Sequence, residues 1–267
     1  MGAPADRYTH GHHDSVLRSH RWRTAANSAG FLVEHLSPGH RLLDVGCGPG
    51  TITSDLAQLV EPGAAIGVDR SADVVSEASA SFVSQTNLTF EVGDVYDLRF
   101  DQGTFDVAYA HQVLQHLTDP VAALTELRRV LRREGLLAVR DADYASFAWY
   151  PADPRLDRWM ALYHEVTRLN GAEADAGRHL AHWVREAGFH DLVVSSSNWT
   201  HQSREETQWW GRLWAGRLRE SDIAAQCLAE GLASRDELDE LARAFLDWSH
   251  DVDSLFVVVS VEVLARA

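Results

Sequence analysis

The segment from Arg41 to Gly50, RLLDVGCGPG, constrains the fold of this 267-residue chain more than any other stretch. Its first half is apolar and has the length of a short buried strand, and its second half places three glycines within five residues. The helix-forming run TITSDLAQLV follows directly. Glycine tolerates positive φ and leaves the backbone bare, so a ligand can lie against such a turn and face the free N–H groups of the helix start. The sequence therefore predicts a strand, a ligand-binding glycine turn and a helix.

The glycine spacing excludes two common phosphate-binding loops. A dinucleotide fingerprint has the form G-x-G-x-x-G, whereas this turn is G-x-G-x-G with Thr51 at the sixth position. A P-loop needs a lysine after its glycines, and the chain contains no lysine. The absence of lysine also excludes Schiff-base chemistry and a pyridoxal phosphate anchor. A dinucleotide-dependent oxidoreductase with a Tyr-x-x-x-Lys pair is excluded for the same reason, although it would share the sheet.

Composition favours a small-molecule partner. The formal net charge is −15, and the arginines form no stripe with interleaved aromatic residues, so we expect no nucleic-acid partner. No apolar run approaches the length of a membrane span and the N-terminus is polar, so we expect a cytoplasmic protein with no membrane partner. The two cysteines form neither a disulfide framework nor a metal spacing, and a homodimer is compatible with these features.

Two further apolar segments end in an acid at a regular interval. AAIGVD ends at Asp69, which lies 25 residues after Asp44, and LTFEVGD ends at Asp94, another 25 residues on. In a doubly wound sheet, the carboxyl ends of parallel strands meet at the edge where ligands bind. We therefore expect the three carboxylates to lie at one edge, where Asp69 can accept hydrogen bonds from two ribose hydroxyls.

The D-V-G-C-G-P-G string after an apolar strand resembles motif I of the class I S-adenosylmethionine-dependent methyltransferases. The succession of elements from Arg41 to Asp141 is similar to the ubiquinone/menaquinone-biosynthesis type of this domain. The resemblance implies an α/β fold with a Rossmann-like, mostly parallel, doubly wound sheet of seven strands, an antiparallel last strand and helical cap insertions. It also implies S-adenosyl-L-methionine as the cofactor and a small organic methyl acceptor.

The resemblance also implies which residues hold the cofactor. Asp44 would contact the amino group of its methionine part. The glycine turn would pass beneath its ribose and methionine, through Gly46, Cys47, Gly48 and Gly50.

Residues after the next three strands would complete the cofactor site. Asp69 would bind the ribose hydroxyls, with Arg70 beside it. Asp94 would accept from the exocyclic amine of adenine, and the backbone N–H of Val95 would meet the ring. His111 follows the FDVAY strand, where the family carries its motif IV, and would line the pocket.

Residues 1–40 are expected to form an arm and a helix. In many small-molecule methyltransferases the N-terminal segment folds over the cofactor, and Tyr8, His13 and Arg23 would then be candidates for the pocket roof. A solvated arm is the alternative interpretation. The four histidines before residue 21 have no cysteine partner and no H-E-x-x-H or H-x-x-E-H spacing, so we expect no metal site.

The methyltransferase domain would span residues 41–267, with cap segments at about 142–172 and 198–250. These segments are rich in aromatic residues. Aromatic residues at helical spacing are either core packing or a substrate pocket, and both interpretations stay open here. The candidates for the substrate pocket are Trp149, Trp159, Tyr163, Trp210 and Trp214.

Methyl transfer to a hydroxyl or an acidic carbon needs a general base, whereas an amine or thiol can dispense with one. By location the candidates for the base are His111, His13 and Asp141. His116, within QVLQHL, is interpreted as a histidine with local partners. The predicted function is methylation of an O, N or C nucleophile in bacterial secondary metabolism. The alternatives are C-methylation of a quinol-like ring and a non-catalytic, methyltransferase-like cofactor-binding protein.

Overall fold

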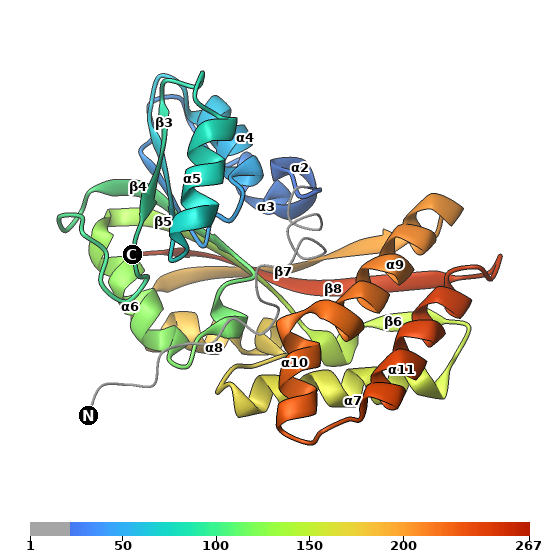
Figure 1. The fold of residues 1–267 in the computed structure, drawn as a ribbon. Coiled ribbons are helices and arrows are strands. Elements are labelled where there is room, and N and C mark those ends of the chain that lie inside the picture. The colour runs from blue at the N-terminus through green and yellow to red at the C-terminus, as the bar shows by residue number, and fades with distance from the viewer. Residues whose placement is uncertain (1–21) are drawn as a thin grey trace.

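The computed structural model describes residues 22–267 as one mixed sheet with helices on both faces and a helical cluster at one end (Figure 1). The strands are β1 (Leu42–Val45), β2 (Ala65–Asp69), β3 (Leu88–Val92), β4 (Phe105–His111), β5 (Leu131–Ala142), β6 (Ala148–Tyr150), β7 (His190–His201) and β8 (Leu255–Arg266). They are ordered β3-β2-β1-β4-β5-β8-β6, and β7 pairs with β8. Neighbours from β3 to β5 are parallel.

Strand β8 runs antiparallel to β5, β6 and β7. The predicted Rossmann-like sheet with an antiparallel last strand is therefore confirmed, with β6 as a strand beyond the seven expected. β8 can hold all three partners because it is 12 residues long: its second half pairs with β5 and its first residues pair with β6.

The described helices are α2 (Ala25–Ser28), α3 (Gly30–Val33), α4 (Thr51–Val60), α5 (Ala72–Ser81), α6 (Pro120–Val130), α7 (Pro154–Leu169), α8 (Ala176–Glu186), α9 (Arg204–Glu220), α10 (Asp222–Ala229) and α11 (Arg235–Trp248). Two short 3₁₀ helices are η1 (Leu114–His116) and η2 (Tyr144–Ser146). Within this described part of the chain, no helix combines the length and apolar character needed to cross a bilayer.

Alternating side chains of the central strands build two cores. Leu43 and Ala108 belong to the cluster that packs under α6 and α8, whereas Leu42 and Val107 belong to the cluster under α2, α3 and α4. This period of two follows from the pleat, which directs successive side chains to opposite faces. Both faces are covered, so these strands are apolar on both sides.

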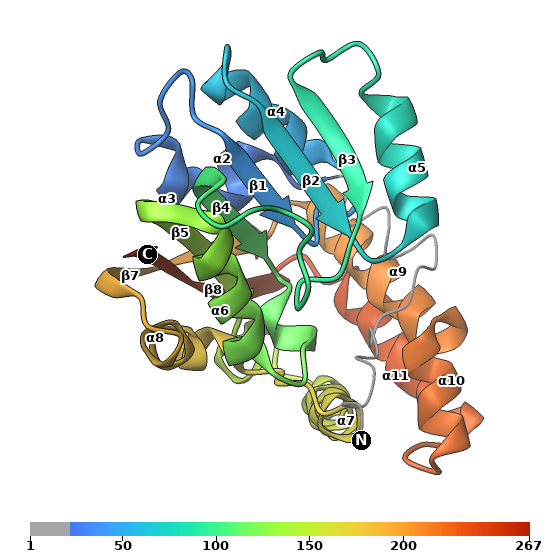
Figure 2. The same ribbon diagram turned by 90° about the vertical axis from the view of Figure 1, so that its left-hand side faces the viewer.

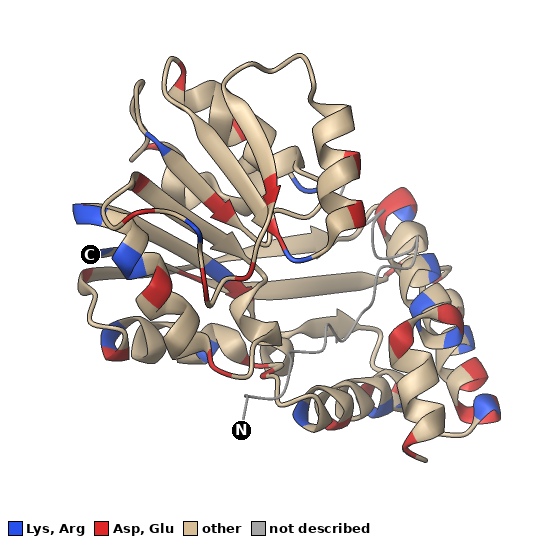
Figure 3. Cartoon of the chain, turned by 60° about the vertical axis from the view of Figure 1, so that its left-hand side comes forward, with Lys and Arg blue, Asp and Glu red and all other residues tan. Residues whose placement is uncertain are grey.

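A third core fills the helical cluster of α7, α9, α10 and α11, which stand together at one end of the molecule (Figure 1). The arrowheads of β2 and β3 point toward the side where this cluster lies (Figure 2). Acidic and basic residues are interspersed along its helices (Figure 3). The carboxyl ends of the parallel strands therefore face a separate, aromatic-rich unit.

Two helix boundaries depart from the continuous helical pattern of the sequence. The segment 203–249 forms three helices, because Ser221 has an extended backbone between α9 and α10 and its hydroxyl donates to the carbonyl of Arg217 at 2.7 Å. The amphipathic run DPVAALTELRRVLRREG continues to Gly135, but α6 ends at Val130, and Leu131 already pairs with Phe105 in the sheet.

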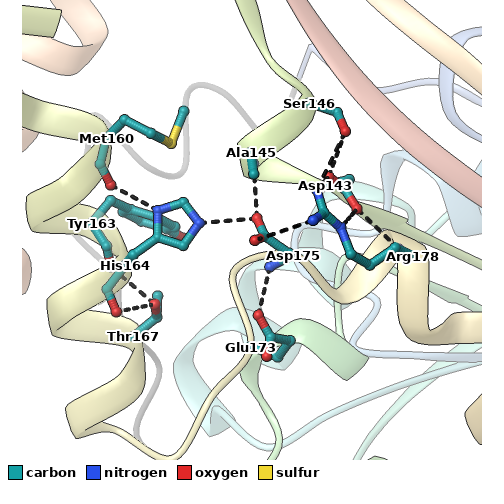
Figure 4. Close-up of polar contacts among 10 residues, drawn as sticks. All are labelled: Asp143, Ala145, Ser146, Met160, Tyr163, His164, Thr167, Glu173, Asp175 and Arg178. Carbon is teal, nitrogen blue, oxygen red and sulfur yellow. Dashed lines mark hydrogen bonds and ion pairs between the residues drawn. The ribbon is translucent and has the colours of Figure 1, made fainter. Parts of the chain in front are cut away.

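A polar network joins the helical cluster to the sheet (Figure 4). Arg178 of α8 donates to Asp143, which follows β5, with Nε 2.8 Å from Oδ2. Burial opposes ionisation of Asp143, but the hydrogen bonds from Arg178 and Ser146 hold its pKa below the ordinary value. On the other side, Nε2 of His164 in α7 lies 3.0 Å from Oδ1 of Asp175. These contacts fix the position of α7 against the end of β5.

Trp159 tests the role of the third core. Its side chain is 1% exposed and contacts the rings of Trp214 and Phe245. We expect Trp159→Ala to lower the free energy of unfolding by about 3–5 kcal/mol, because a large cavity replaces the indole. Guanidinium denaturation measures this loss. Val252→Ala, at a side chain 93% exposed, is the control and should change stability by less than about 0.5 kcal/mol. Equal free energies of unfolding for the two variants would contradict the placement of Trp159 in the third core.

Candidate active site

A cavity of about 630 Å³ lies at the carboxyl ends of the parallel strands, within the size range of about 300–1,000 Å³ usual for small-molecule sites. Two groups of side chains line it. The strand-end group comes from the carboxyl ends of β1 and β2 and from the turns after β1 and β3, and it includes Asp44, Gly46, Cys47, Gly48, Asp69 and Asp94. The aromatic group comes mainly from η2, β7 and α9 and includes Trp22, Tyr144, Phe147, Trp199, Trp209 and Trp210.

The glycine turn is built as the sequence predicts. The backbone N–H groups of Gly46 and Cys47 both donate to the carbonyl of Val68, at 2.7 and 3.1 Å, which fastens the turn to β2. Gly46 has a φ of 66°, and a Cβ at this position would overlap the side chain of Val113. Only glycine fits this backbone conformation and this spacing.

Gly50 has a packing role in the turn. Its φ is 80°, and a Cβ here would overlap the ring of Phe90, which lies behind the turn. Gly50 is not among the residues that line the cavity, whereas Pro49 and Thr51 on either side line it. This glycine allows α4 to pack closely on β3, and its contact with the cofactor stays a prediction.

Asp44 is the most buried acid of the strand-end group, with 2% exposure. Its Oδ2 accepts a hydrogen bond from the Thr53 hydroxyl at 2.6 Å. Burial raises the pKa of Asp44 to about 7; the hydrogen bond from Thr53 opposes this shift and the charge of Asp69 adds to it. A positively charged ligand group would favour the ionised form of this carboxyl.

Asp69 links the second strand to the glycine turn. Its Oδ2 accepts from the N–H of Gly48 at 3.1 Å, and its Oδ1 accepts from the N–H of Ser71 at 2.9 Å. Asp94 accepts from the N–H of Tyr96 at 3.0 Å. Because both acids line the same cavity as Asp44, the expected gathering of three strand-end carboxylates is confirmed. Four other predicted residues also line the cavity, namely Arg23, Arg70, Val95 and His111.

His111 ends β4 beside a buried cation. It is the register partner of Arg140 in β5, and Nη1 of Arg140 lies 3.5 Å from its Nδ1. The guanidinium also lies 3.3 Å from Glu262. Because a guanidinium only donates hydrogen bonds, Nδ1 of His111 is the acceptor in this contact.

The aromatic group forms a continuous wall. Trp22 meets Trp199 edge to face with centroids 5.4 Å apart, and His201 stacks on Trp210 at 4.6 Å. Trp209 lies 5.8 Å from Trp22. Of these residues only Trp210 was predicted from the sequence to belong to a substrate site. The missed signal is the alternation of Trp199 and His201, which places both on one face of β7 at its carboxyl-terminal end.

Two histidines of the cavity wall are neutral. Burial lowers the pKa of His116 to about 3, and the positive charges of Arg23 and Arg217 add to the shift. Burial lowers the pKa of His201 to about 4, although the negative charge of Glu206 acts to raise it. His116 has the local partner that was expected, the Gln115 amide at 3.0 Å, but it also lines the cavity. Both rings are weak bases near neutral pH.

Four predicted substrate residues lie outside the cavity wall. Trp159 and Trp214 are in the third core, Tyr163 stacks behind Tyr144, and Trp149 stacks on Phe256. For the three residues on helices, the helical spacing shows which side chains share a face but not what that face contacts. Trp149 lies on strand β6, where the same uncertainty applies.

Asp141 also lies outside the cavity wall, which corrects its assignment as a base. It is fully buried, and its Oδ1 accepts from the N–H of Gln115 at 3.1 Å, which positions η1 against β5. Burial raises its pKa to about 7. The predicted residues Tyr8 and His13 lie outside the described residues. No group of three or more metal-ligating side chains occurs between residues 22 and 267.

Comparison with known proteins agrees with this geometry. The family model of the methyltransferase domain matches residues 36–206. An uncharacterized methyltransferase of Schizosaccharomyces pombe is 31% identical over 283 residues, covering 100% of this chain and 99% of its own length. The chain belongs to the methyltransferase domain family.

Two further similarities extend over most of this methyltransferase. A demethylmenaquinone methyltransferase of Roseiflexus castenholzii is 30% identical over 190 residues, or 64% of this chain and 75% of that protein. Phosphoethanolamine N-methyltransferase 2 of Haemonchus contortus, solved with S-adenosyl-L-methionine, has the same fold, with a TM-score of 0.57 and 15% identity. It covers 95% of this chain and 57% of its own.

The cofactor of the methyltransferase is S-adenosyl-L-methionine, and the strand-end group fits this molecule. Three carboxylates supply acceptors for amine and hydroxyl donors, and the side-chain-free face of the turn leaves room for a ribose. Asp44 is already buried, so an ammonium group beside it would be paired in a low-dielectric site.

Asp69→Asn should weaken binding of S-adenosylhomocysteine by tenfold or more, because hydrogen bonds to a charged acceptor contribute about 1.5–3 kcal/mol. Isothermal titration calorimetry measures the dissociation constant. Asp73→Asn, at an exposed acid in the first turn of α5, is the matched control and should bind normally. Equal affinities of the two variants would contradict a role for Asp69 in binding.

The pH dependence of binding tests Asp44. As the pH falls through about 7, Asp44 takes up a proton and loses the charge that would bind an amino group. We expect affinity for S-adenosylhomocysteine to fall roughly fivefold from pH 7 to pH 6. Asp44→Asn should bind more weakly, with no such dependence. Calorimetry measures the affinity at each pH, and thermal unfolding confirms that the protein is folded there. A wild-type affinity that does not change between pH 7 and pH 6 would contradict the role of Asp44 in binding the amino group.

Proposed function

We propose that this methyltransferase transfers a methyl group from S-adenosyl-L-methionine to a small organic acceptor held by the aromatic group of the cavity. The observation that carries the proposal is that one cavity is lined by both groups of side chains. A cofactor on the strand-end side and a flat acceptor on the aromatic side would then share one enclosed space. We further propose that segments 142–172 and 198–250 form the cap over this space.

The strand-end residues would hold the cofactor as the sequence motif implies. Asp44 would bind its amino group, Asp69 its ribose hydroxyls, and Asp94 with the N–H of Val95 its adenine. Asp69 has a second effect, because its hydrogen bond to Gly48 keeps the glycine turn in place. Its carboxylate can accept further hydrogen bonds, since an ionised carboxyl has about four lone-pair sites.

The cofactor supplies a methyl group already activated on a sulfonium. The work left to the chain is alignment of the acceptor and exclusion of water, and alignment alone can lower a barrier by about 7–11 kcal/mol. The rings of Trp199 and Trp210 would hold a planar acceptor by stacking and shield it from water. Aromatic faces near the sulfonium would stabilise its charge by about 0.5–2 kcal/mol each.

Two described histidines of the cavity wall, His116 and His201, are weak bases. Neither suits the role of general base, and an amine or an acceptor that loses its proton easily needs none. C-methylation of a quinol-like ring is the second candidate, since the aromatic wall suits such a ring and the demethylmenaquinone enzyme is a relative.

The test is formation of S-adenosylhomocysteine with acceptors that differ in their nucleophilic atom, read as the mass gain of one methyl group. We expect turnover with flat, ring-containing acceptors. Trp210→Ala should raise the acceptor KM by about tenfold or more, because base or ring stacking on an aromatic side chain is worth about 1–3 kcal/mol. Affinity for the cofactor should stay within a fewfold. Preference for a nicotinamide dinucleotide over S-adenosylmethionine, or cofactor binding without turnover, would contradict the proposal.

A further inference from the structure

A buried arginine lies behind the cavity wall. Arg140 of β5 is 0% exposed and is not among the residues that line the cavity, but it contacts two residues that do. Its Nη1 lies 3.5 Å from Nδ1 of His111, and its guanidinium carbon lies 4.7 Å from the ring centre of Trp199. The two rings also meet each other edge to face, with centroids 5.7 Å apart. One cation therefore touches a wall residue from β4 and a wall residue from β7.

The sheet fixes the position of this guanidinium. Glu262 of β8 is the register partner of both Arg140 in β5 and Ser195 in β7. Nε of Arg140 donates to Oε1 of Glu262 at 3.3 Å and to the hydroxyl of Ser197 at 3.1 Å. The hydroxyl of Ser195 donates to Oε2 of the same carboxylate at 2.9 Å. The cation is therefore held in place by three neighbouring strands before any ligand binds.

The contact with Arg140 decides which nitrogen of His111 carries the proton. A guanidinium has no acceptor atom, so Nδ1 of His111 must be unprotonated to accept from Nη1. In the neutral ring the proton is then on Nε2. The other tautomer would place an N–H group of the ring against an N–H group of the guanidinium. In the favoured form the ring donates at Nε2 and cannot take up a proton there, and the guanidinium occupies the other nitrogen.

The same guanidinium fixes the ring of Trp199. The indole N–H donates to the carbonyl of Asn27 at 2.7 Å, which holds one edge of the ring, and the cation lies over the ring itself. A planar guanidinium can stack on an indole, whereas a lysine ammonium is a point charge without a flat face. A wall residue that is held in one orientation can align a flat acceptor, because alignment requires a fixed surface.

We propose that Arg140 is a positioning residue for methyl transfer, which holds His111 as a hydrogen-bond donor and Trp199 as a fixed surface for the acceptor. The acceptor is then aligned without a base at His111. Such a site serves an amine, or an acceptor that loses its proton easily, and leaves an ordinary alcohol without help in losing its proton. The inference rests on the proposed function and names a residue that shapes the acceptor side of the site without touching the acceptor.

Nitrogen-15 NMR of the full chain with labelled histidines reads the tautomer directly. The signals of His111 are identified by their loss in His111→Gln. We expect the wild type at pH 7 to have an unprotonated Nδ1 and a protonated Nε2 at this residue. Arg140→Met combined with Glu262→Gln removes the donor without leaving a buried carboxylate unpaired, and it should shift the His111 signals toward a mixture of tautomers. A protonated Nδ1 in the wild type, or unchanged His111 signals in the double variant, would overturn the inference.

Steady-state kinetics test the contact with Trp199. Arg140→Lys keeps the charge and a donor but loses the flat face that covers the indole. With the acceptor that the wild type turns over fastest, we expect the acceptor KM to rise about fivefold or more, because a stacked guanidinium is not replaced by an ammonium. The kcat should change less than threefold. A merely structural role would lower the folded fraction, and with it the apparent kcat, at an unchanged KM, and that result would overturn the inference.

Ser195→Ala is the matched control, because it removes a hydrogen bond to Glu262 from the same row of strands and leaves the contacts of Arg140 with both rings in place. It should keep the wild-type tautomer of His111 and the wild-type acceptor KM. S-adenosylhomocysteine affinity should stay within threefold in all these variants. The NMR measurement on the wild type decides the tautomer even if the Arg140 variants fail to fold. Failure of the wild type to bind S-adenosylhomocysteine, or to methylate any acceptor, would instead overturn the proposed function.

Discussion

The site depends on the hydrogen bonds that fasten the glycine turn to the second strand. The carbonyl of Val68 accepts from two successive N–H groups of the turn, and Asp69, the next residue, accepts from a third. One strand end therefore fixes the backbone of the turn and one of the three acids together. Because β1 and β2 are parallel neighbours, their carboxyl ends meet at one edge of the sheet, which brings the turn within hydrogen-bond reach of Val68 and Asp69.

Strand β8 connects that edge to the acceptor side. One edge of β8 pairs first with β6 and then with β5, and the other edge pairs with β7 along almost its whole length. The aromatic wall on β7 and the central sheet are therefore held by one continuous strand. A polar row crosses the same strands, from His111 through Arg140 to Glu262. Arg140 and Glu262 are both buried, so loss of either one would leave an uncompensated buried charge behind the cavity-lining His111.

The fold and the strand-end group could be predicted because both follow from local rules. A glycine turn after an apolar strand, and acids repeated at the interval of one strand and helix, locate Asp44, Asp69 and Asp94 without any long-range contact. The aromatic group could not be assigned in the same way. Trp210 and Trp214 lie on one helix, yet one faces the cavity and the other packs on Phe245, and only the neighbouring helices decide between them. The packing of Gly50 on Phe90 could not be predicted either, because the sequence shows a glycine at this position but not which side chain lies beside it.

A crystal structure of the complex with S-adenosylhomocysteine tests the central claim most directly, because it locates the ligand relative to all three acids at once. The account predicts the ribose hydroxyls at Asp69, the adenine beside Asp94, the amino group near Asp44 and the sulfur facing the tryptophans of β7 and α9. Density for the ligand outside this cavity, or an adenosine that contacts none of the three carboxylates, would contradict it.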